Sequence, residues 1–255
     1  MIGVFDSGIG GLSVLSALRA AYPSADLLYY ADTARLPYGG RSPALIRRFA
    51  REAGERFAAL GADYLAVACG TVSALALDEI KAAAHCPTSG VIRPAVDLLA
   101  RDGRRRVLIL STEATANARA FETELLARTP SALSLSLGCP LFVPLIENGY
   151  FSPNDPAVLS LLGRTLSPGQ TFFPDAVLLG CTHFRLLAGA IASLFPGIPL
   201  YDCGEAAAGA VPAEYGRGDG TLRVLVSDAP ERFRRAAIRA GGLPDGVEVE
   251  AIQQE

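Results

Sequence analysis

Val67-Ala68-Cys69-Gly70-Thr71 and Leu179-Gly180-Cys181-Thr182-His183 are two stretches of similar design. In each, a cysteine comes just after a short apolar run that is typical of a buried strand, and a threonine follows closely. The two cysteines lie too far apart in the sequence for a local metal or disulfide motif. A fold that brings both strand ends together could instead place one thiol on each face of a small substrate. The pattern therefore suggests paired acid–base chemistry.

Strand and helix signals alternate on both sides of these stretches, which predicts an α/β fold with mostly parallel sheets flanked by helices. The predicted strands are 2–5, 26–30, 64–68, 88–92, 107–110, 133–137, 141–143, 176–179, 200–201, 222–226 and 247–251. The predicted helices start near residues 12, 42, 70, 115, 156, 186, 205 and 231; those from 115, 156 and 186 end near 127, 166 and 195. Ligands of such sheets bind beyond the carboxyl ends of the strands. Asp6, Cys69, Thr112 and Cys181 all occupy that kind of position.

Composition excludes several classes of function. The 255-residue chain is 50% hydrophobic and 19% charged, with a net charge of −3, so no electrostatic feature indicates nucleic acid or an anionic membrane surface. Five cysteines without a CxxC pair indicate free thiols in a reducing compartment, so we expect a cytoplasmic protein. With two histidines and no cysteine cluster, no metal site is expected. A pyridoxal phosphate enzyme would have to use Lys81, the only lysine.

The glycine-rich run from Asp6 to Gly11 follows the first predicted strand but matches neither a dinucleotide fingerprint nor a P-loop. It could be a tight turn into a helix, or a site where Asp6, Ser7 and backbone N–H groups hold a charged ligand. Cys69 alone could be a small buried hydrophobe. His183 favours a functional Cys181, because residues 181 and 183 point to the same side if the backbone stays extended there.

Several motifs occur in the order typical of bacterial glutamate racemases, which this chain resembles over essentially its whole length. They are residues 5–12 (FDSGIGGL), Asp32 through Pro37-Tyr38-Gly39, Ala68-Cys69-Gly70-Thr71, Cys139-Pro140-Leu141 through Glu147, and Gly180-Cys181-Thr182-His183-Phe184. The resemblance implies two pseudo-symmetric α/β domains with the active site between them. They would comprise residues 1–93 plus 203–255, and residues 94–202. A homodimer is expected only from the resemblance.

The resemblance also implies a cofactor-independent, two-base interconversion of L- and D-glutamate for peptidoglycan precursor synthesis. One cysteine, as thiolate, would remove the α-proton, and the other, as thiol, would protonate the opposite face. Asp6 would assist Cys69, while His183, with Glu147 nearby, would assist Cys181. The implied substrate contacts are Asp6, Ser7, Tyr38, Gly39, Gly70, Thr71, Thr112, Thr115, Thr182 and His183.

One departure is Gly70, where this family usually has an asparagine that contacts the substrate. Losing that amide removes a hydrogen-bonding group worth ~1–3 kcal/mol if nothing replaces it. Three alternatives stay open: a racemase for aspartate or another acidic amino acid, a catalytically weak binding protein of the same fold, which Gly70 favours, and a Cys-His hydrolase, which would explain Cys181 with His183. The hydrolase would leave Cys69 and Asp6 without a role.

Overall fold

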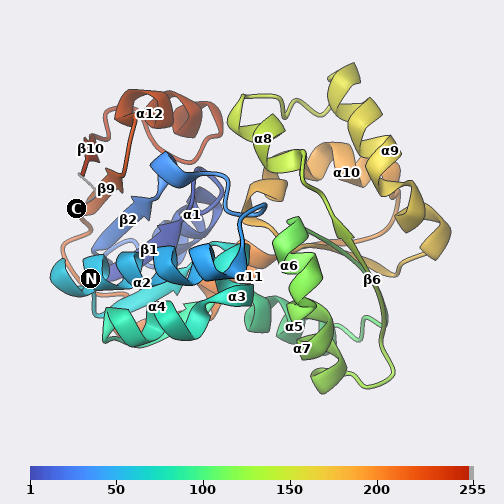
Figure 1. The fold of residues 1–255 in the computed structure, drawn as a ribbon, viewed down its shortest axis with the longest axis horizontal. Helices are drawn as coiled ribbons and strands as arrows, with labels where there is room; N and C mark the ends of the chain where they lie inside the picture. The colour runs from blue at the N-terminus through green and yellow to red at the C-terminus, as the bar shows by residue number, and fades with distance from the viewer. Residues whose placement is uncertain (253–255) are drawn as a thin grey trace.

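The computed structural model describes residues 1–252, which form two parallel sheets that lie side by side (Figure 1). The first sheet has the strand order β10-β9-β2-β1-β3-β4, and the second has the order β6-β5-β7-β8. Every paired strand in both sheets is parallel to its neighbour. The predicted α/β fold class is therefore confirmed. In the described part of the chain, no helix is long and apolar enough to cross a membrane.

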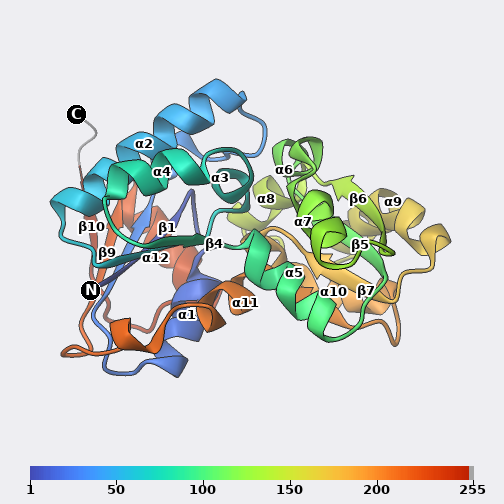
Figure 2. The same ribbon diagram turned by 90° about the horizontal axis from the view of Figure 1, so that it is seen from below.

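The first sheet has helices on both faces (Figure 2). Its strands are β1 (Ile2–Asp6), β2 (Leu27–Ala31), β3 (Tyr64–Val67), β4 (Thr88–Gly90), β9 (Leu222–Val226) and β10 (Val249–Ala251). Around them lie α1 (Leu12–Ala21), α2 (Pro43–Ala59), α3 (Gly70–Leu75), α4 (Leu77–Ala84), α12 (Pro230–Arg239) and the 3-10 turns η1 (Thr33–Arg35) and η3 (Ala213–Tyr215). Alternate strand residues pack against α1 and α12 on one face and against α2 and α4 on the other, as the two-residue period of a strand requires.

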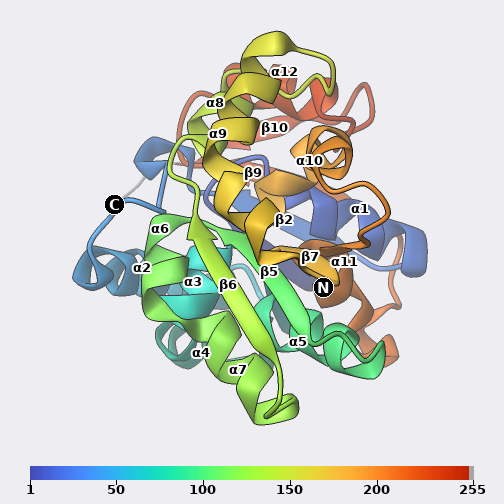
Figure 3. The same cartoon turned by 90° about the vertical axis from the view of Figure 1, so that its right-hand side faces the viewer.

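The second sheet is likewise covered on both faces (Figure 3). Its strands are β5 (Arg106–Ser111), β6 (Leu133–Gly138), β7 (Ala176–Leu179) and β8 (Leu200–Asp202). The helices are α5 (Ile92–Arg101), α6 (Glu113–Ala118), α7 (Ala120–Arg128), α8 (Phe142–Glu147), α9 (Pro156–Phe172), α10 (Ala188–Leu194), α11 (Cys203–Gly209) and the 3-10 helix η2 (Thr182–Leu187). Helices α5, α7 and α11 pack on one face, and α8, α9, η2 and α10 pack on the other.

The two sheets repeat one strand order, because β2-β1-β3-β4 in the first corresponds to β6-β5-β7-β8 in the second. In each series the first strand lies between the second and the third. Connections leave such a sheet in opposite directions from these two central strands, which opens a crevice at their carboxyl ends. Cys69 follows β3 and Cys181 follows β7, so the two cysteines hold equivalent places.

A continuous apolar cluster joins the two halves of the molecule. It includes Leu15 and Tyr29 beside the first sheet and Phe142 and Ile191 beside the second. The chain passes from the first sheet to the second after β4 and leaves the second after β8, with α11 packed between α1 and α5. The domain limits expected above stay a prediction, and residues 253–255 of the first domain lie outside the described residues.

One expected strand is wrong. Residues 141–143 are not a strand: Phe142 begins α8, which continues to Glu147. Phe142, Val143 and Ile146 are buried at helical spacing, a pattern that a three-residue apolar run is too short to reveal. Pro144 is tolerated because it lies in the first turn, where a backbone N–H has no acceptor within the helix.

Three expected helices have different limits. The helix expected over 115–127 is divided at Arg119, whose φ of 52° is left-handed, into α6 and α7. The helix expected from residue 186 is preceded by η2 and begins properly at Ala188. Helix α9 continues past Pro168, which cannot donate to the carbonyl of Arg164; the Ser167 hydroxyl donates to that oxygen instead, at 3.2 Å.

Candidate active site

A small cavity lies where the carboxyl ends of the central strands of both sheets meet. Its volume is about 20 Å³, on the order of the space for one water molecule. An amino acid would therefore require the two halves to move apart. The lining residues are Asp6, Ser7, Pro37, Tyr38, Gly39, Cys69, Gly70, Thr71, Thr112, Val143, Cys181, Thr182 and His183.

Only two of the site residues expected from the sequence do not line this cavity. Glu147 lies behind His183, and Thr115 lies behind Thr112. Val143 also lines the cavity, although the sequence predicts a strand around it and no role in the site. Its place on α8 follows a helical spacing with Phe142 and Ile146 that so short an apolar run does not reveal in the sequence.

Cys69 shares its side of the cavity with a buried carboxylate. The Asp6 carboxylate is 1% exposed; its Oδ1 accepts the N–H of Gly8 at 2.8 Å and its Oδ2 accepts the hydroxyl of Thr182 at 3.2 Å. Burial, followed by the charge of Asp6, raises the pKa of the Cys69 thiol to about 12. Burial also raises the pKa of Asp6, although the positive charge of His183 opposes the shift. Cys69 is therefore a thiol in this site.

Cys181 has a different partner. Its Sγ lies 3.9 Å from Nδ1 of His183, whose Nε2 lies 2.7 Å from Oε1 of Glu147. Burial alone would lower the pKa of His183, but the contacts with Cys181 and Glu147 raise it well above its usual value. Burial likewise opposes ionisation of Glu147, yet the hydrogen bond from His183 holds its pKa low. The pair is thus an imidazolium and a carboxylate, and the imidazolium stabilises negative charge on the Cys181 sulfur.

A turn rather than a strand brings Cys181 and His183 together. Cys181 itself is extended, with φ −130° and ψ 129°, but Thr182 begins the 3-10 helix η2. The premise of an extended backbone through residue 183 is therefore wrong, while the expected proximity of thiol and imidazole is present.

The glycine-rich turn after β1 supports the histidine and glutamate of the other half. The N–H of Ile9 donates to Oε1 of Glu147 at 3.0 Å. A side chain on Gly8 would collide with Glu147, and one on Gly10 would collide with the ring of His183. Because Asp6 accepts the N–H of Gly8 and Glu147 that of Ile9, the anions held at this turn are the protein's own carboxylates.

Gly70 lies directly against the turn that leads into Cys181. A Cβ at this position would lie 2.8 Å from the carbonyl oxygen of Gly180, well inside ordinary van der Waals contact. The missing side chain therefore lets the end of β3 approach the backbone that leads into Cys181. An asparagine at position 70 does not fit this arrangement of the two halves.

Hydroxyl groups form a second bridge across the cavity. Oγ1 of Thr71 lies 3.1 Å from Oγ1 of Thr112, which lies 2.9 Å from Oγ1 of Thr115. The N–H of Ala114 donates to the carbonyl of Gly39 at 3.1 Å, and Gly39 packs directly against Thr112. The loop from Pro37 therefore touches the opposite half of the molecule. Within residues 1–252, no group of three or more His, Cys, Asp or Glu side chains could hold a metal ion.

Two matched halves that each supply one thiol with its own ionisable partner define a class of enzyme that removes a proton from one face of a carbon atom and adds another proton to the opposite face. Such a carbon is the α-carbon of an amino acid.

The chain belongs to the Asp/Glu/Hydantoin racemase family, whose model matches residues 12–211, as the sequence motifs indicated. A glutamate racemase of Thermus thermophilus is 38% identical, over 99% of this chain and 97% of the relative. A glutamate racemase of Aquifex aeolicus is 36% identical, over 92% and 91%. The crystal structure of glutamate racemase from Francisella tularensis in complex with D-glutamate matches with a TM-score of 0.90 and 29% identity, covering 99% of this chain and 97% of that one.

Proposed function

We propose that this protein interconverts L-glutamate and D-glutamate by two-base catalysis without a cofactor, and that its product serves peptidoglycan precursor synthesis. The observation that carries the proposal is the pair of equivalent cysteines, Cys69 and Cys181, on one cavity with different acid–base partners. The glutamate racemases of similar sequence and structure support glutamate as the substrate.

The two cysteines have different resting roles in this proposal. Cys181, whose sulfur lies 3.9 Å from Nδ1 of His183, is the base that removes the α-proton of one enantiomer. The thiol of Cys69 delivers its proton to the opposite face of the planar carbon. The other enantiomer needs the reverse assignment, in which Cys69 is the base and Cys181 is the acid. Its α-ammonium group would lie near Asp6 and offset the negative charge that disfavours the Cys69 thiolate.

Polar groups around the cavity stabilise the negative charge that develops at the carbon and its carboxylate. The residues that line the cavity offer the hydroxyls of Ser7 and Thr71 and the backbone N–H groups of Tyr38 and Gly39 as donors for this purpose. Donors fixed before the reaction are effective because little reorganisation is needed as charge develops. The hydroxyl of Tyr38 is not among them, because it donates to Asp32.

We further propose the division into residues 1–93 plus 203–255 and residues 94–202, with opening between these two parts admitting the substrate. A homodimer and a cytoplasmic location complete the proposal. The cavity of about 20 Å³ supports the opening step, because it has no room for glutamate when closed.

The proposal is tested by incubating the purified protein with L-glutamate, and separately with L-aspartate, in deuterated water without pyridoxal phosphate. We expect D-glutamate carrying α-deuterium and much slower conversion of aspartate. Faster conversion of aspartate would reassign the substrate. Binding of glutamate without exchange at the α-carbon would identify a catalytically silent binding protein and refute the proposal.

A further inference from the structure

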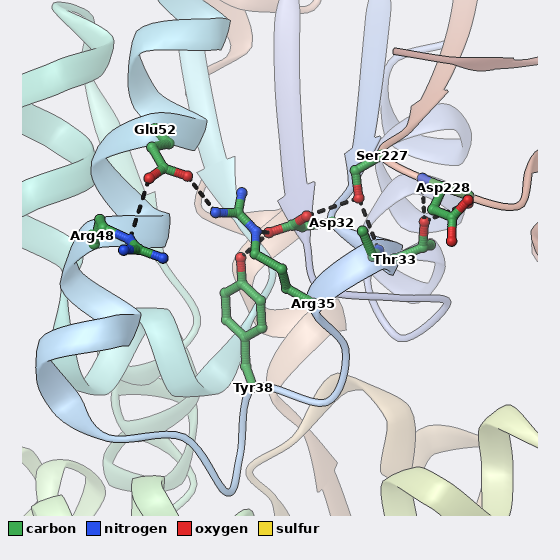
Figure 4. Close-up of polar contacts among 9 residues, drawn as sticks. Asp32, Thr33, Arg35, Tyr38, Arg48, Glu52, Ser227 and Asp228 are labelled. Carbon is green, nitrogen blue, oxygen red and sulfur yellow. Dashed lines mark hydrogen bonds and ion pairs between the residues drawn. The ribbon is translucent and has the colours of Figure 1, made fainter. Parts of the chain in front are cut away.

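A second buried carboxylate, Asp32, lies outside the cavity but is bound to a residue of its wall. It follows β2 directly and is 0% exposed. Its Oδ2 accepts the hydroxyl of Tyr38 and the Nε–H of Arg35, the latter at 2.6 Å, while its Oδ1 accepts the hydroxyl of Ser227 at 2.8 Å. Figure 4 shows these donors converging on Asp32 from three directions.

The donors to Asp32 are themselves held in place. Arg35 also pairs with Glu52 on α2, and its guanidinium lies 4.1 Å from the centre of the Phe49 ring. Ser227 accepts the N–H of Ala34 at 2.9 Å, so the turn after β2 is tied to the turn after β9 (Figure 4). A charged group removed from water is stable only when its hydrogen bonds are satisfied, and bonds to a carboxylate are among the stronger ones. The cluster therefore fixes the positions of the side chains that donate to Asp32.

Tyr38 is the part of the cluster that reaches the cavity. Its ring packs 5.4 Å from that of Phe49 and 6.3 Å from that of Phe5, measured between centroids, which leaves the side chain pointing into the first half. Its neighbours Pro37 and Gly39 line the cavity, and the carbonyl of Gly39 accepts a hydrogen bond from Ala114 of the second half. The Tyr38 ring thus fixes residues 37–39, which line the cavity and contact the second half of the molecule.

A comparison with Asp26 shows that Asp32 does more than connect β2 to the C-terminal segment. Asp26 lies at the other end of β2, and its Oδ1 accepts the N–H and the hydroxyl of Thr221 at 3.0 and 2.5 Å and the N–H of Asp219 at 3.2 Å. Both aspartates therefore connect the same two segments. Only Asp32 also binds Tyr38.

We propose that Asp32 is a positioning residue that, through the hydroxyl of Tyr38, holds the backbone of residues 37–39 in place for the substrate. This inference rests on the proposed function, because it assigns those residues to substrate binding. The hydrogen bond between Asp32 and Tyr38 would then affect the affinity for the substrate, although the Asp32 side chain does not touch the substrate.

The test compares Asp32→Asn, Tyr38→Phe and the double variant with Asp26→Asn as the matched control. We expect KM for glutamate to rise about tenfold in each of the first two, with kcat changed less than about threefold, since both variants remove the charge-assisted hydrogen bond between Tyr38 and Asp32. The double variant should be no worse than Asp32→Asn. The control should leave KM and kcat unchanged, even where it lowers the melting temperature. Equal effects of Asp26→Asn and Asp32→Asn on KM, or additive effects of the two single variants, would overturn the proposal.

Amide hydrogen exchange separates failure of this proposal from failure of the proposed function. In Asp32→Asn, the amides of Arg41 and Ala114, which donate to the carbonyls of Tyr38 and Gly39, should exchange at least about tenfold faster than in the wild type, while Asp26→Asn should leave their exchange unchanged. This measurement needs no activity. If the wild type converted no acidic amino acid, the proposed function would fail and exchange alone would decide the anchoring of the loop. Unchanged exchange in Asp32→Asn would overturn the positioning role whatever the activity.

Discussion

Gly70→Ala adds a single carbon atom at the point where the two cysteine turns meet. The new Cβ would lie 2.8 Å from the carbonyl oxygen of Gly180, 3.8 Å from its carbonyl carbon and 3.9 Å from the Cα of Cys181. The first of these contacts is backbone, which cannot rotate away as a flexible side chain would. The backbone at Gly70 itself accepts alanine, because it is the first residue of a helix rather than a left-handed turn.

The size of the effect follows from this geometry. Ordinary contacts of a Cβ start at 3.4 Å, so the two turns must separate by at least about 0.6 Å in the closed state. A displacement of about 1 Å at the reacting groups can cost roughly a hundredfold in rate. We therefore expect kcat/KM to fall between about tenfold and a hundredfold. Overpacking of this kind destabilises a fold by ~1–3 kcal/mol when the structure cannot yield, and by less here because the halves can open.

The assay follows racemisation of glutamate by circular dichroism, starting from each enantiomer, together with the melting temperature. Because the two enantiomers are equal in free energy, kcat/KM must fall equally in both directions. Gly40→Ala is the matched control, since a Cβ there meets nothing within 4 Å. Gly70→Asn should be at least as slow as Gly70→Ala, although it adds an amide. Wild-type kcat/KM in Gly70→Ala would refute the close approach of the two turns.

Two further predictions concern the ionisable partners of the cysteines. Glu147→Gln removes the negative charge that lies 2.7 Å from Nε2 of His183, so the pKa of His183 should fall. The alkaline limb of the kcat/KM–pH profile should then move to lower pH. A limb that does not move would contradict an imidazolium beside Cys181. Asp6→Asn should slow racemisation but stabilise the fold at neutral pH. Burial raises the pKa of Asp6 above its ordinary 3.8, so its contribution to stability is present below pH 3.8 and is lost as pH rises through the folded-state pKa. The melting temperature of Asp6→Asn minus that of the wild type should therefore increase as the pH rises from 3.8 through the folded-state pKa of Asp6. A difference that stays constant or decreases would contradict a buried carboxylate with a raised pKa.

The architecture could be predicted because it depends on local patterns. Alternating strand and helix signals gave parallel sheets, and strand ends gave Asp6, Cys69 and Cys181 as neighbours, since carboxyl ends of parallel strands meet at one edge. The motifs then identified the family, which the comparisons confirmed. The first step uses local patterns, and the second uses short motifs and their order along the chain.

What escaped prediction depends on contacts between distant segments. Nothing near Gly70 in the sequence reveals the carbonyl of Gly180 that occupies the space of a side chain. Asp32 belongs to a recognised motif, but one of its donors, Ser227, lies 195 residues away. The break at Arg119 is a single left-handed residue within a sequence of good helix formers, so local propensity could not place it.

The central claim is that two different groups, Cys181 and Cys69, exchange protons with opposite faces of one carbon atom. Its most direct test is early-time deuterium labelling of glutamate in deuterated water. A proton removed by one thiol stays on that sulfur, while the other sulfur carries a deuteron from solvent. The product enantiomer should therefore carry α-deuterium from the first turnovers, while the remaining substrate stays unlabelled. Substrate labelled as fast as product would contradict the account, because it would show one group serving both faces.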